Sequence, residues 1–251
     1  GDDTFKAGLD STGIYKEYED GNDGNDYIDG GEGEEDGIGD TLDYSAFGSS
    51  RAISVDLGIV SNVAGYTDVS TVTVSDGTID YIKNIENVIG SQGNDFITGS
   101  DLDNTLSGGL GNDTLVGGKG NDYLDGGNDI DVADYSASDA ITVDLSLSSN
   151  QVTAGTYGID TLTDIEVVVG STYQDVFKGN NSTNDTFIGG DSNDTFIATK
   201  GSDTYYGGNA TISNGTVTTH TASGIDTVDY SSYSGKVLVD LSASTAIATK
   251  S

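Results

Sequence analysis

A repeat of nine residues runs through the middle of the chain, from Gly90 to Ser136, and leaves few folds open. Successive segments read GSQGNDFIT, GSDLDNTLS, GGLGNDTLV and GGKGNDYLD, followed by GGNDIDVADYS. Glycines in the first half of each segment permit positive φ and a tight turn. Apolar, aromatic and β-branched residues in the last three positions favour a short strand. Each nonapeptide therefore predicts one turn and one strand, which is half of a coil.

The acidic residues of the repeat follow the same coil. Two nonapeptides make one coil, so turns on the same side should recur every eighteen residues, the spacing of Asp95, Asp113 and Asp131 and also of Asn104 and Asp122. The sixth-position side chains are thus predicted to form two rails, one along each edge of a right-handed parallel β-solenoid. Carbonyl oxygens and two carboxylates would line the gap between stacked turns. Such a flexible, all-oxygen site suits calcium better than magnesium.

These repeats resemble the RTX (repeats-in-toxin, hemolysin-type) calcium-binding family, whose nonapeptide is G-G-x-G-x-D-x-U-x, with U a large apolar residue. The resemblance implies a right-handed parallel β-roll with several calcium ions in its turns, held by the sixth-position Asp and by backbone carbonyls of neighbouring turns. It also implies a bacterial protein that leaves the cell unfolded by type I secretion. Such a protein would fold in the extracellular space or at the cell surface.

The residues that the resemblance assigns to calcium are the sixth-position acids and the carbonyl donors of the best-preserved block. They are Asp26, Gly90, Gln92, Gly93, Asp95, Gly108, Leu110, Gly111, Asp113, Gly117, Lys119, Gly120, Asp122, Gly126, Asn128, Asp131, Asp175, Asp185, Asp194 and Asp203. Leu102 and Asn104 depart from the pattern, and one residue is inserted near Asn180. We expect weak or empty sites where the fourth glycine is replaced, as at Tyr173 and Ser192.

The chain is strongly acidic, with 42 Asp and Glu against 9 Lys and Arg and a net charge of −33. This balance argues against nucleic acid and anionic membranes as partners. Without a cation, repulsion between carboxylates should keep the chain open, so folding and metal binding are expected to be coupled. We expect a chain that is disordered in chelator and β-rich in millimolar calcium. Its sites should bind in the range of about 10⁻⁴ to 10⁻³ M.

Targeting and cross-linking features are absent from the sequence. There is no cysteine, no apolar run long enough for a transmembrane helix and no signal peptide. Calcium would therefore replace disulfides as the stabilising element, and no membrane insertion is predicted. Because the chain starts and stops inside repeat units, we expect it to be a fragment of a longer protein.

A second, longer period overlies the nonapeptides. The tripeptide Asp-Tyr-Ser occurs at residues 43–45, 134–136 and 229–231, and each copy precedes an alternating segment, at 53–57, 141–145 and 237–241, that predicts a half-buried strand. In the first two units, matched return segments at 80–90 and 160–170 lead into the next block. The predicted divisions are a degenerate RTX block (1–45), a strand-rich spacer (46–89), the main RTX β-roll block (90–136), a second strand-rich spacer (137–169), a third RTX block (170–231) and the start of a further spacer (232–251).

The eighth position of each nonapeptide should supply a narrow core. These residues are predicted to stack inward as ladders: Ile28, Leu42, Ile97, Leu106, Leu115, Leu124, Ala133, Phe177, Phe187, Phe196, Tyr205 and Val228. A core of this size cannot easily offset both the glycine entropy and the charge, so calcium should supply the remaining stability.

Catalysis is not expected. His220 is the single histidine and lies in a polar stretch, and the chain has no H-E-x-x-H helix, no G-x-S-x-G elbow and no cysteine nucleophile. A carboxylate pair for glycoside chemistry stays open, although the acids are already explained as calcium ligands. Glu86 and Glu166 recur in matched places and are expected to cap a turn or add ligands.

Two classes of function remain. The first is a calcium-dependent structural segment of a secreted surface protein, such as an S-layer subunit, an adhesin stalk or a filament. Its partners would be calcium together with copies of itself, neighbouring surface-layer subunits or cell-surface polysaccharide. The second is the carboxy-terminal RTX module of a secreted enzyme or toxin, which drives export and folding. The tandem long units and the absence of catalytic motifs favour the first.

Overall fold

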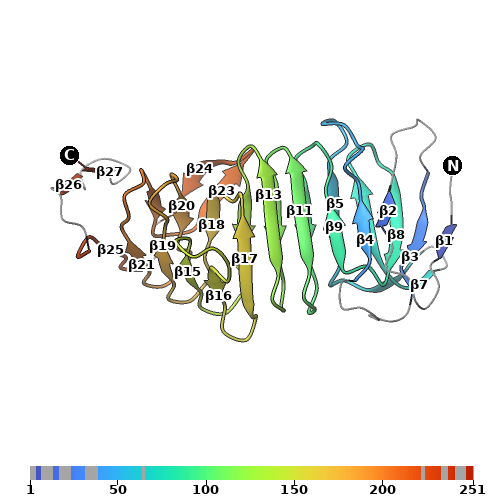
Figure 1. Ribbon diagram of the computed structural model, residues 1–251, viewed down its shortest axis with the longest axis horizontal. Helices are drawn as coiled ribbons and strands as arrows, with labels where there is room; N and C mark the ends of the chain where they lie inside the picture. Colours follow the sequence, from blue (N-terminus) through green and yellow to red (C-terminus); the bar gives the residue numbers. More distant parts are fainter. Residues whose placement is uncertain are drawn as a thin grey trace.

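The computed structural model describes residues 4–6, 14–16, 24–31, 39–63, 66–221, 224–232, 237–240 and 247–250. These residues form an elongated stack in which the strands run across the long axis (Figure 1). Strands are the only regular elements among them. The predicted all-β class is therefore confirmed.

Two large sheets contain most of the described strands. In spatial order, the first consists of β1 (Thr4–Lys6), β3 (Tyr27–Asp29), β8 (Ile79–Lys83), β7 (Tyr66–Val74), β5 (Ile53–Asp56), β10 (Phe96–Thr98), β12 (Thr114–Val116), β14 (Val132–Asp134), β18 (Val167–Val169), β20 (Thr186–Ile188) and β22 (Thr204–Tyr206), with β6 (Ser61–Val63) beside β7. The second consists of β2 (Ile14–Lys16), β4 (Thr41–Asp43), β9 (Asn87–Ile89), β11 (Thr105–Leu110), β13 (Tyr123–Asn128), β17 (Ile159–Thr163), β16 (Val152–Thr153), β15 (Thr142–Asp144), β19 (Val176–Lys178), β21 (Thr195–Ile197) and β25 (Thr227–Asp229). Two separate hairpins are β23 (Ala210–Ser213) with β24 (Thr216–His220), and β26 (Val237–Asp240) with β27 (Ile247–Lys250).

Consecutive strands of the nonapeptide block alternate between the two sheets. Within the block, strands pair in parallel at an offset of eighteen residues, as Phe96 does with Thr114 and Thr105 with Tyr123. The register from β12 to β14 has the same offset, with Thr114 opposite Val132. Each nonapeptide is thus half a coil, as its turn and strand pattern predicts, and the architecture is a parallel β-roll.

The spacers add antiparallel strands without interrupting the sheets. Strands β5, β7 and β8 pair antiparallel, and so do β15, β16 and β17. The return strands then rejoin the roll in parallel register, with Tyr81 of β8 opposite Tyr27 and Thr161 of β17 opposite Tyr123. The return segments therefore continue the coil of the block that precedes them.

The eighth-position side chains form the core between the sheets. Those that are fully buried are Ile28, Leu42, Ile97, Leu106, Leu115, Leu124, Ala133, Phe177, Phe187 and Phe196. The rings of Phe177 and Phe196 stack with their centroids 5.2 Å apart. Each buried side chain of this size contributes about 1.5–3 kcal/mol relative to an exposed one.

The last two members of the predicted core differ from the rest. Tyr205 is half-buried against the core, and Val228 is 40% exposed, so the prediction that Val228 points into a closed core is wrong. Both lie on terminal strands, β22 and β25, of their sheets within the described part of the chain. Val228 has the coil of β21 on one side only.

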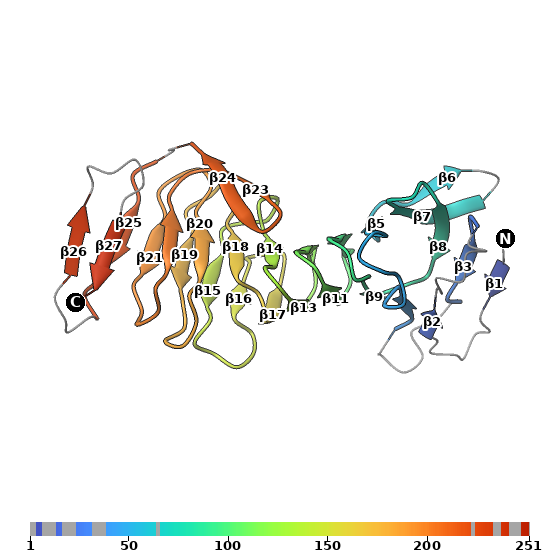
Figure 2. The ribbon, with the colours of Figure 1, turned by 90° about the horizontal axis from the view of Figure 1, so that it is seen from above.

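The hairpin β23–β24 lies along the outer face of the roll, beside β18 and β20 (Figure 2). It interrupts the third block between Asp203 and Asp226. The buried side chains of Val132, Val167 and Ile188 point out of the sheet and pack against the partly buried Ala210, Ile212 and Val217. The hairpin therefore covers an apolar strip that would otherwise face water.

Several predicted features lie outside the described residues. They include Gly21–Asp23 at the start of the first-block turn, the degenerate stretch 32–38 and Leu241 in the last spacer.

Candidate metal centres

Hydrogen bonds join the sixth-position residues of successive coils. The N–H of Asp95 donates to Oδ1 of Asp113 at 2.7 Å, and the N–H of Asp113 donates to Oδ1 of Asp131 at 2.8 Å. On the other edge, the N–H of Asn104 donates to Oδ1 of Asp122 at 2.9 Å. The two rails that the eighteen-residue spacing predicts are therefore present. In each rail, one carboxylate oxygen is used by the backbone of the neighbouring coil.

In four of the sixth-position residues, the second carboxylate oxygen has no hydrogen-bond donor. Oδ2 of Asp113, Asp122, Asp131 and Asp194 is buried and has no hydrogen-bond partner. Burial raises the pKa of Asp113 to about 8 and the pKa values of Asp122 and Asp131 to about 7. A buried oxygen without a partner costs about 1–3 kcal/mol, and more when it is charged. These positions therefore favour a bound proton or a bound cation.

Only glycine at the first position of the turn leaves room for this oxygen. A Cβ atom built on Gly108 would lie 2.2 Å from Oδ2 of Asp113. Over Gly90, the same construction meets Oδ2 of Asp95 at 2.5 Å and the carbonyl oxygen of Gly108, one coil further on, at 2.4 Å. A carboxylate and a backbone carbonyl thus converge over the glycine. Carboxylate and carbonyl oxygens are the ligands that calcium takes in proteins, so the donor set fits the predicted ion.

The remaining predicted donors of the main block contribute main chain. The third-position side chains are exposed: Gln92, Leu110, Lys119 and Asn128. Of the glycines, Gly93 and Gly111 stack on each other, and a Cβ on Gly111 would lie 2.4 Å from the carbonyl oxygen of Gly93. Gly120 stacks in the same way on Leu102, at 2.5 Å. The glycines can therefore offer only a carbonyl oxygen to the turn.

The glycines that precede the last two acids of the main block repeat the pattern of Gly108. A Cβ on Gly117 would lie 2.3 Å from Oδ2 of Asp122, and a Cβ on Gly126 would lie 2.6 Å from Oδ2 of Asp131. At Gly126 the converging carbonyl belongs to Asp164, at 2.2 Å, in the return segment of the second spacer. The candidate centres thus reach from the block into the spacer.

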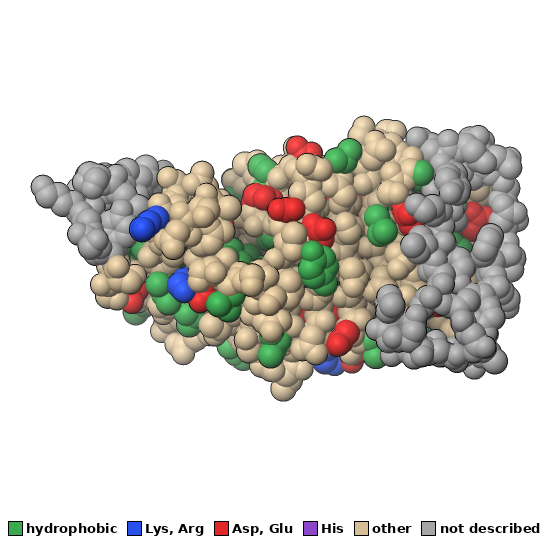
Figure 3. All heavy atoms as spheres, viewed as in Figure 1, with side chains coloured by type: hydrophobic (Ala, Val, Ile, Leu, Met, Phe, Trp, Pro, Cys, Tyr) green, Lys and Arg blue, Asp and Glu red, His purple; other side chains and the backbone are tan. Residues whose placement is uncertain are grey.

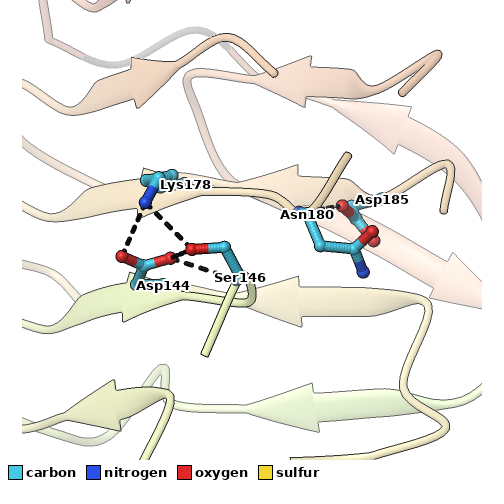
Figure 4. Close-up of polar contacts among 5 residues, drawn as sticks. All are labelled: Asp144, Ser146, Lys178, Asn180 and Asp185. Atoms are coloured by element: carbon cyan, nitrogen blue, oxygen red, sulfur yellow. Dashed lines mark hydrogen bonds and ion pairs between the residues drawn. The ribbon is translucent and has the colours of Figure 1, made fainter. Parts of the chain in front are cut away.

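In the third block the rail is continuous although the spacing of its acids is irregular. The N–H of Asp175 donates to Oδ1 of Asp194 at 2.9 Å across nineteen residues, and the N–H of Asp185 donates to Oδ1 of Asp203 at 3.3 Å across eighteen. The inserted residue is taken up by a local turn in which Oδ1 of Asn180 accepts the N–H of Ser182 at 2.6 Å. The N–H of Asn180 donates to Oδ2 of Asp185 at 3.0 Å (Figure 4).

Asp26 lies in the rail of the first block. It is buried, and its N–H donates to Oδ1 of Asp80 at 3.0 Å. Its rail partner comes from the return segment of the first spacer. The structure therefore brings Asp26 next to an acid that the nonapeptide pattern does not include.

The fifth-position residues, Asn or Asp, form a second ladder that the nonapeptide template does not predict, because the template leaves that position free. Oδ1 of Asn94 accepts the N–H of Asn112 at 2.9 Å, and Oδ1 of Asn112 accepts the N–H of Ile130 at 2.9 Å. On the other edge, Oδ1 of Asp103 accepts the N–H of Asn121 at 2.8 Å. This ladder runs in the direction opposite to the aspartate rail. The recurrence of Gly-Asn-Asp in the sequence is the signal that could have revealed it.

The return segments supply rail members that are not nonapeptide residues. Oε2 of Glu166 accepts the N–H of Asp131 at 2.9 Å, and Oε2 of Glu86 accepts the N–H of Asp40 at 2.8 Å. Each glutamate thus takes the place of a sixth-position Asp, which explains why the two recur in matched positions.

The first two Asp-Tyr-Ser tripeptides each place a tyrosine inside the roll. The hydroxyl of Tyr135 donates to Oδ2 of Asp160 at 2.9 Å, and that of Tyr44 donates to Oδ2 of Asp80 at 2.7 Å. Both tyrosines are buried, and burial raises the pKa of Asp160 and that of Tyr135. The repeated tripeptide is evident in the sequence, whereas the partner of Tyr135 is not, because Asp160 lies 25 residues further on.

The face seen in Figure 3 carries acidic side chains in separate groups and few basic ones. Among the basic residues of the chain, Lys178 donates to Oδ2 of Asp144 at 2.8 Å and to Oγ of Ser146 at 2.9 Å (Figure 4). Across the described ranges, no three His, Cys, Asp or Glu side chains are grouped closely enough to hold a metal. Ions in the turns would therefore depend on backbone carbonyls as much as on carboxylates. No helix that could cross a membrane is found in the same residues.

A family model described as the RTX calcium-binding nonapeptide repeat matches the chain at residues 20–35, 84–101, 98–133 and 180–210. The matches include both rails of the main block and the acids Asp26, Asp185, Asp194 and Asp203, whereas Asp175 lies between two matches. No curated protein matches the chain. Repeats of this family bind calcium in multiple copies and are typical of secreted proteins. The chain therefore carries four copies of the RTX calcium-binding nonapeptide repeat, folded as a parallel β-roll with calcium as its cofactor.

Proposed function

We propose that this chain is a calcium-dependent structural segment of a secreted bacterial surface protein, such as an S-layer subunit, an adhesin stalk or an extracellular filament. It folds and stiffens when calcium enters its turns outside the cell, after type I secretion. One observation supports this most directly. The rails of buried carboxylates continue from the blocks into the spacers, through Asp122 to Asp160 and through Asp131 to Glu166. Calcium binding would then stiffen one continuous rod.

The coupling between ion and fold follows from the charge. The chain has a net charge of −33, and the partnerless oxygens of its rails lie inside the roll. Bringing these carboxylates together without cations is unfavourable, because each loses its hydration and faces other negative charges. The free energy of calcium binding would then be folding free energy. Sites of about 10⁻⁴ to 10⁻³ M would stay empty in the cytosol and fill outside the cell.

The segment is proposed to have no catalytic role of its own. The rail acids are hydrogen-bonded to the neighbouring coil and are assigned to calcium, which leaves no acid–base pair to propose among the described residues. Partners other than calcium would meet its outer surface. Copies of itself, neighbouring surface-layer subunits and cell-surface polysaccharide are the partner classes that a rod of this kind would contact.

Calcium titration tests the proposal. The chain in chelator should give a circular dichroism spectrum with clearly less β structure than in millimolar calcium, which should produce a β-rich spectrum together with an elongated particle in small-angle X-ray scattering. A spectrum that is folded and unchanged by chelation would refute the calcium switch. Sedimentation in calcium then separates the two classes of function. Self-association supports a surface assembly, whereas a folded monomer at all concentrations supports the alternative, an export module of a secreted enzyme or toxin.

A further inference from the structure

The buried carboxylates of the roll differ in whether the protein supplies a hydrogen-bond donor to each of their two oxygens. The turns of the four Asp residues with a partnerless Oδ2 all begin with two glycines, at Gly108-Gly109, Gly117-Gly118, Gly126-Gly127 and Gly189-Gly190. We call these the Gly-Gly turns. In each, the second glycine has a positive φ, which is +104° at Gly109. A Cβ there would lie 2.7 Å from the carbonyl oxygen of Ser91, so this backbone excludes a side chain that could serve the carboxylate.

Serine replaces the second glycine in the turns of Asp95 and Asp175. The N–H of Ser91 donates to Oδ2 of Asp95 at 2.5 Å, and its hydroxyl donates to Oδ1 at 2.8 Å. Ser171 serves Asp175 in the same way, with its N–H at 2.7 Å and its hydroxyl at 3.0 Å. Neither serine has a positive φ. Both oxygens of each carboxylate therefore have protein donors, including the N–H of Ile53 for Asp95 and of Ile141 for Asp175.

Tyrosine does the same for the acids of the return segments. In Asp160, Oδ1 accepts the N–H of Asp122 and Oδ2 accepts the hydroxyl of Tyr135, each at 2.9 Å. In Asp80, Oδ2 accepts the hydroxyl of Tyr44 at 2.7 Å. A buried hydroxyl thus occupies the place that is left without a partner in a Gly-Gly turn.

Four of the hydroxyl-paired carboxylates fall in two segments of the chain, and two more, Asp185 and Asp203, accept the hydroxyls of Thr183 and Thr199 in the third block. Asp80 and Asp95 lie in the segment Tyr44–Asp95, which we call the first junction, and Asp160 and Asp175 lie in Tyr135–Asp175, the second junction. The Gly-Gly turns lie outside both, in 108–131 and 189–194. Along the chain, carboxylates whose two oxygens both have protein donors thus alternate with carboxylates that have one oxygen without a donor.

We propose that the two junctions are metal-independent coils, in which serine and tyrosine hydroxyls take the part of the cation, and that calcium occupies the Gly-Gly turns. This rests on the calcium-dependent folding proposed above and deepens it. It changes two sequence-based expectations, because Asp95 and Asp175 would not be ligands and the chain in chelator would keep two folded segments. Calcium would then extend coils from these preformed segments into the blocks, which avoids nucleating the roll anew.

Calcium stoichiometry tests the assignment of the sites. Isothermal titration of the whole chain should show that Asp113→Asn and Asp122→Asn each lose bound calcium relative to the unaltered chain. Asp95→Asn and Asp175→Asn, which keep a side-chain oxygen for the serine, should bind as much calcium as the unaltered chain. If Asp175→Asn loses as much calcium as Asp113→Asn, the proposal is overturned. If the unaltered chain binds no calcium, the proposed function fails first, so the two failures are distinguishable.

Hydrogen exchange in chelator tests the folded segments. Amides of β17 and β18, in the second junction, should be protected at least tenfold more than those of β12, and calcium should remove this difference. Tyr135→Phe should abolish the protection of the second junction in chelator and leave that of the first. The matched control is Tyr123→Phe, which removes an exposed hydroxyl that accepts a hydrogen bond from Thr163 at 3.0 Å and should have no effect. Uniform exchange of β12, β17 and β18 in chelator would overturn the proposal.

Discussion

The first and second junctions pack on the preceding blocks through the same backbone but with different charges. Asp29 and Asp125 are the last block residues in register with the return strands β8 and β17, where they lie opposite Lys83 and Thr163. Asn84 and Asp164 directly follow those return strands, and both have a left-handed backbone, with φ of 52° and 47°. In the first case, Oδ1 of Asp29 accepts Nδ2 of Asn84 at 2.8 Å.

In the second case an acid stands in place of that amide. Oδ1 of Asp125 is buried without a hydrogen-bond partner, and the pKa of Asp125 is raised, first by burial and then by the charge of Asp164. Asn and Asp both tolerate the left-handed conformation, so the backbone is preserved while the electrostatics change. The comparison teaches that the turn geometry of the roll sets where polar groups meet, and single side chains then decide whether they attract or repel.

The tyrosine hydroxyls should give the largest effect and one that is equal at the two junctions. Tyr44→Phe and Tyr135→Phe each leave a buried carboxylate oxygen without its donor, which should lower the free energy of unfolding by about 1–3 kcal/mol. Urea unfolding in saturating calcium, followed by circular dichroism, measures both. A loss at one junction alone would show that the two are not equivalent.

Removing a basic side chain should have a smaller effect on the free energy of unfolding, and this effect should differ between the two junctions. Arg51, which is buried, has its guanidinium carbon 3.7 Å from the ring centroid of Phe47 and its Nε 2.9 Å from Asp76. Lys178, which follows the second junction, pairs with Asp144 of that junction at 2.8 Å but is more exposed than Arg51. Arg51→Ala should therefore lower the free energy of unfolding by about 1–2 kcal/mol, and Lys178→Ala by less than about 1 kcal/mol. Urea unfolding at low and high salt measures both losses. A larger loss for Lys178→Ala than for Arg51→Ala would contradict the prediction.

Exchanging the amide and the acid should convert one junction into the other. Asp164→Asn should raise the free energy of unfolding by about 0.5–1.5 kcal/mol, because the new amide can donate to Asp125 as Asn84 does to Asp29. The matched reverse change, Asn84→Asp, should lower it by a similar amount. Both are measured by urea unfolding in saturating calcium. A loss of stability in Asp164→Asn would instead identify the Asp164 carboxylate as a calcium ligand.

Lowering the pH should have the smallest effect. It should reduce the difference in stability between the two junctions. The folded-state pKa of Asp125 is raised above the unfolded value of about 3.9. Its stabilising contribution is therefore present at low pH and is lost as pH rises through the folded pKa. Lowering the pH from about 8 to about 5 in chelator should protect the amides of β17 more than those of β8, after correction for intrinsic exchange. Equal changes in the two strands, or no loss of the difference in Asp164→Asn, would contradict this account.

The coil and its rails could be predicted because they depend on spacing alone. A turn of glycines followed by a strand such as Phe96-Ile97-Thr98 has one way to repeat, and the eighteen-residue offset then places Asp95, Asp113 and Asp131 in line. The same spacing identifies inward residues such as Leu106 and Leu124. Local periodicity was sufficient because each coil contacts only its neighbours.

The rest depends on contacts that no period encodes. The partner of Tyr135 is Asp160, beyond an inserted spacer, and the oxygen that it satisfies looks identical in sequence to the partnerless one of Asp113. Val228 fits the core pattern, yet its exposure is decided by what lies on either side of its strand. The packing of the hairpin β23–β24 on Val132 and Val167 likewise has no signal in the nonapeptides.

That hairpin also has a mechanical consequence. At its tip, Oδ1 of Asn214 accepts the side-chain amides of Asn94 at 2.6 Å and of Asn112 at 3.1 Å, across 120 and 102 residues of chain. A solenoid pulled along its axis would normally yield one coil at a time, because neighbouring coils are its only supports. Here a clip ties coils of the main block to the third block. The coils between the clipped points would resist extension together and then give way in a single step.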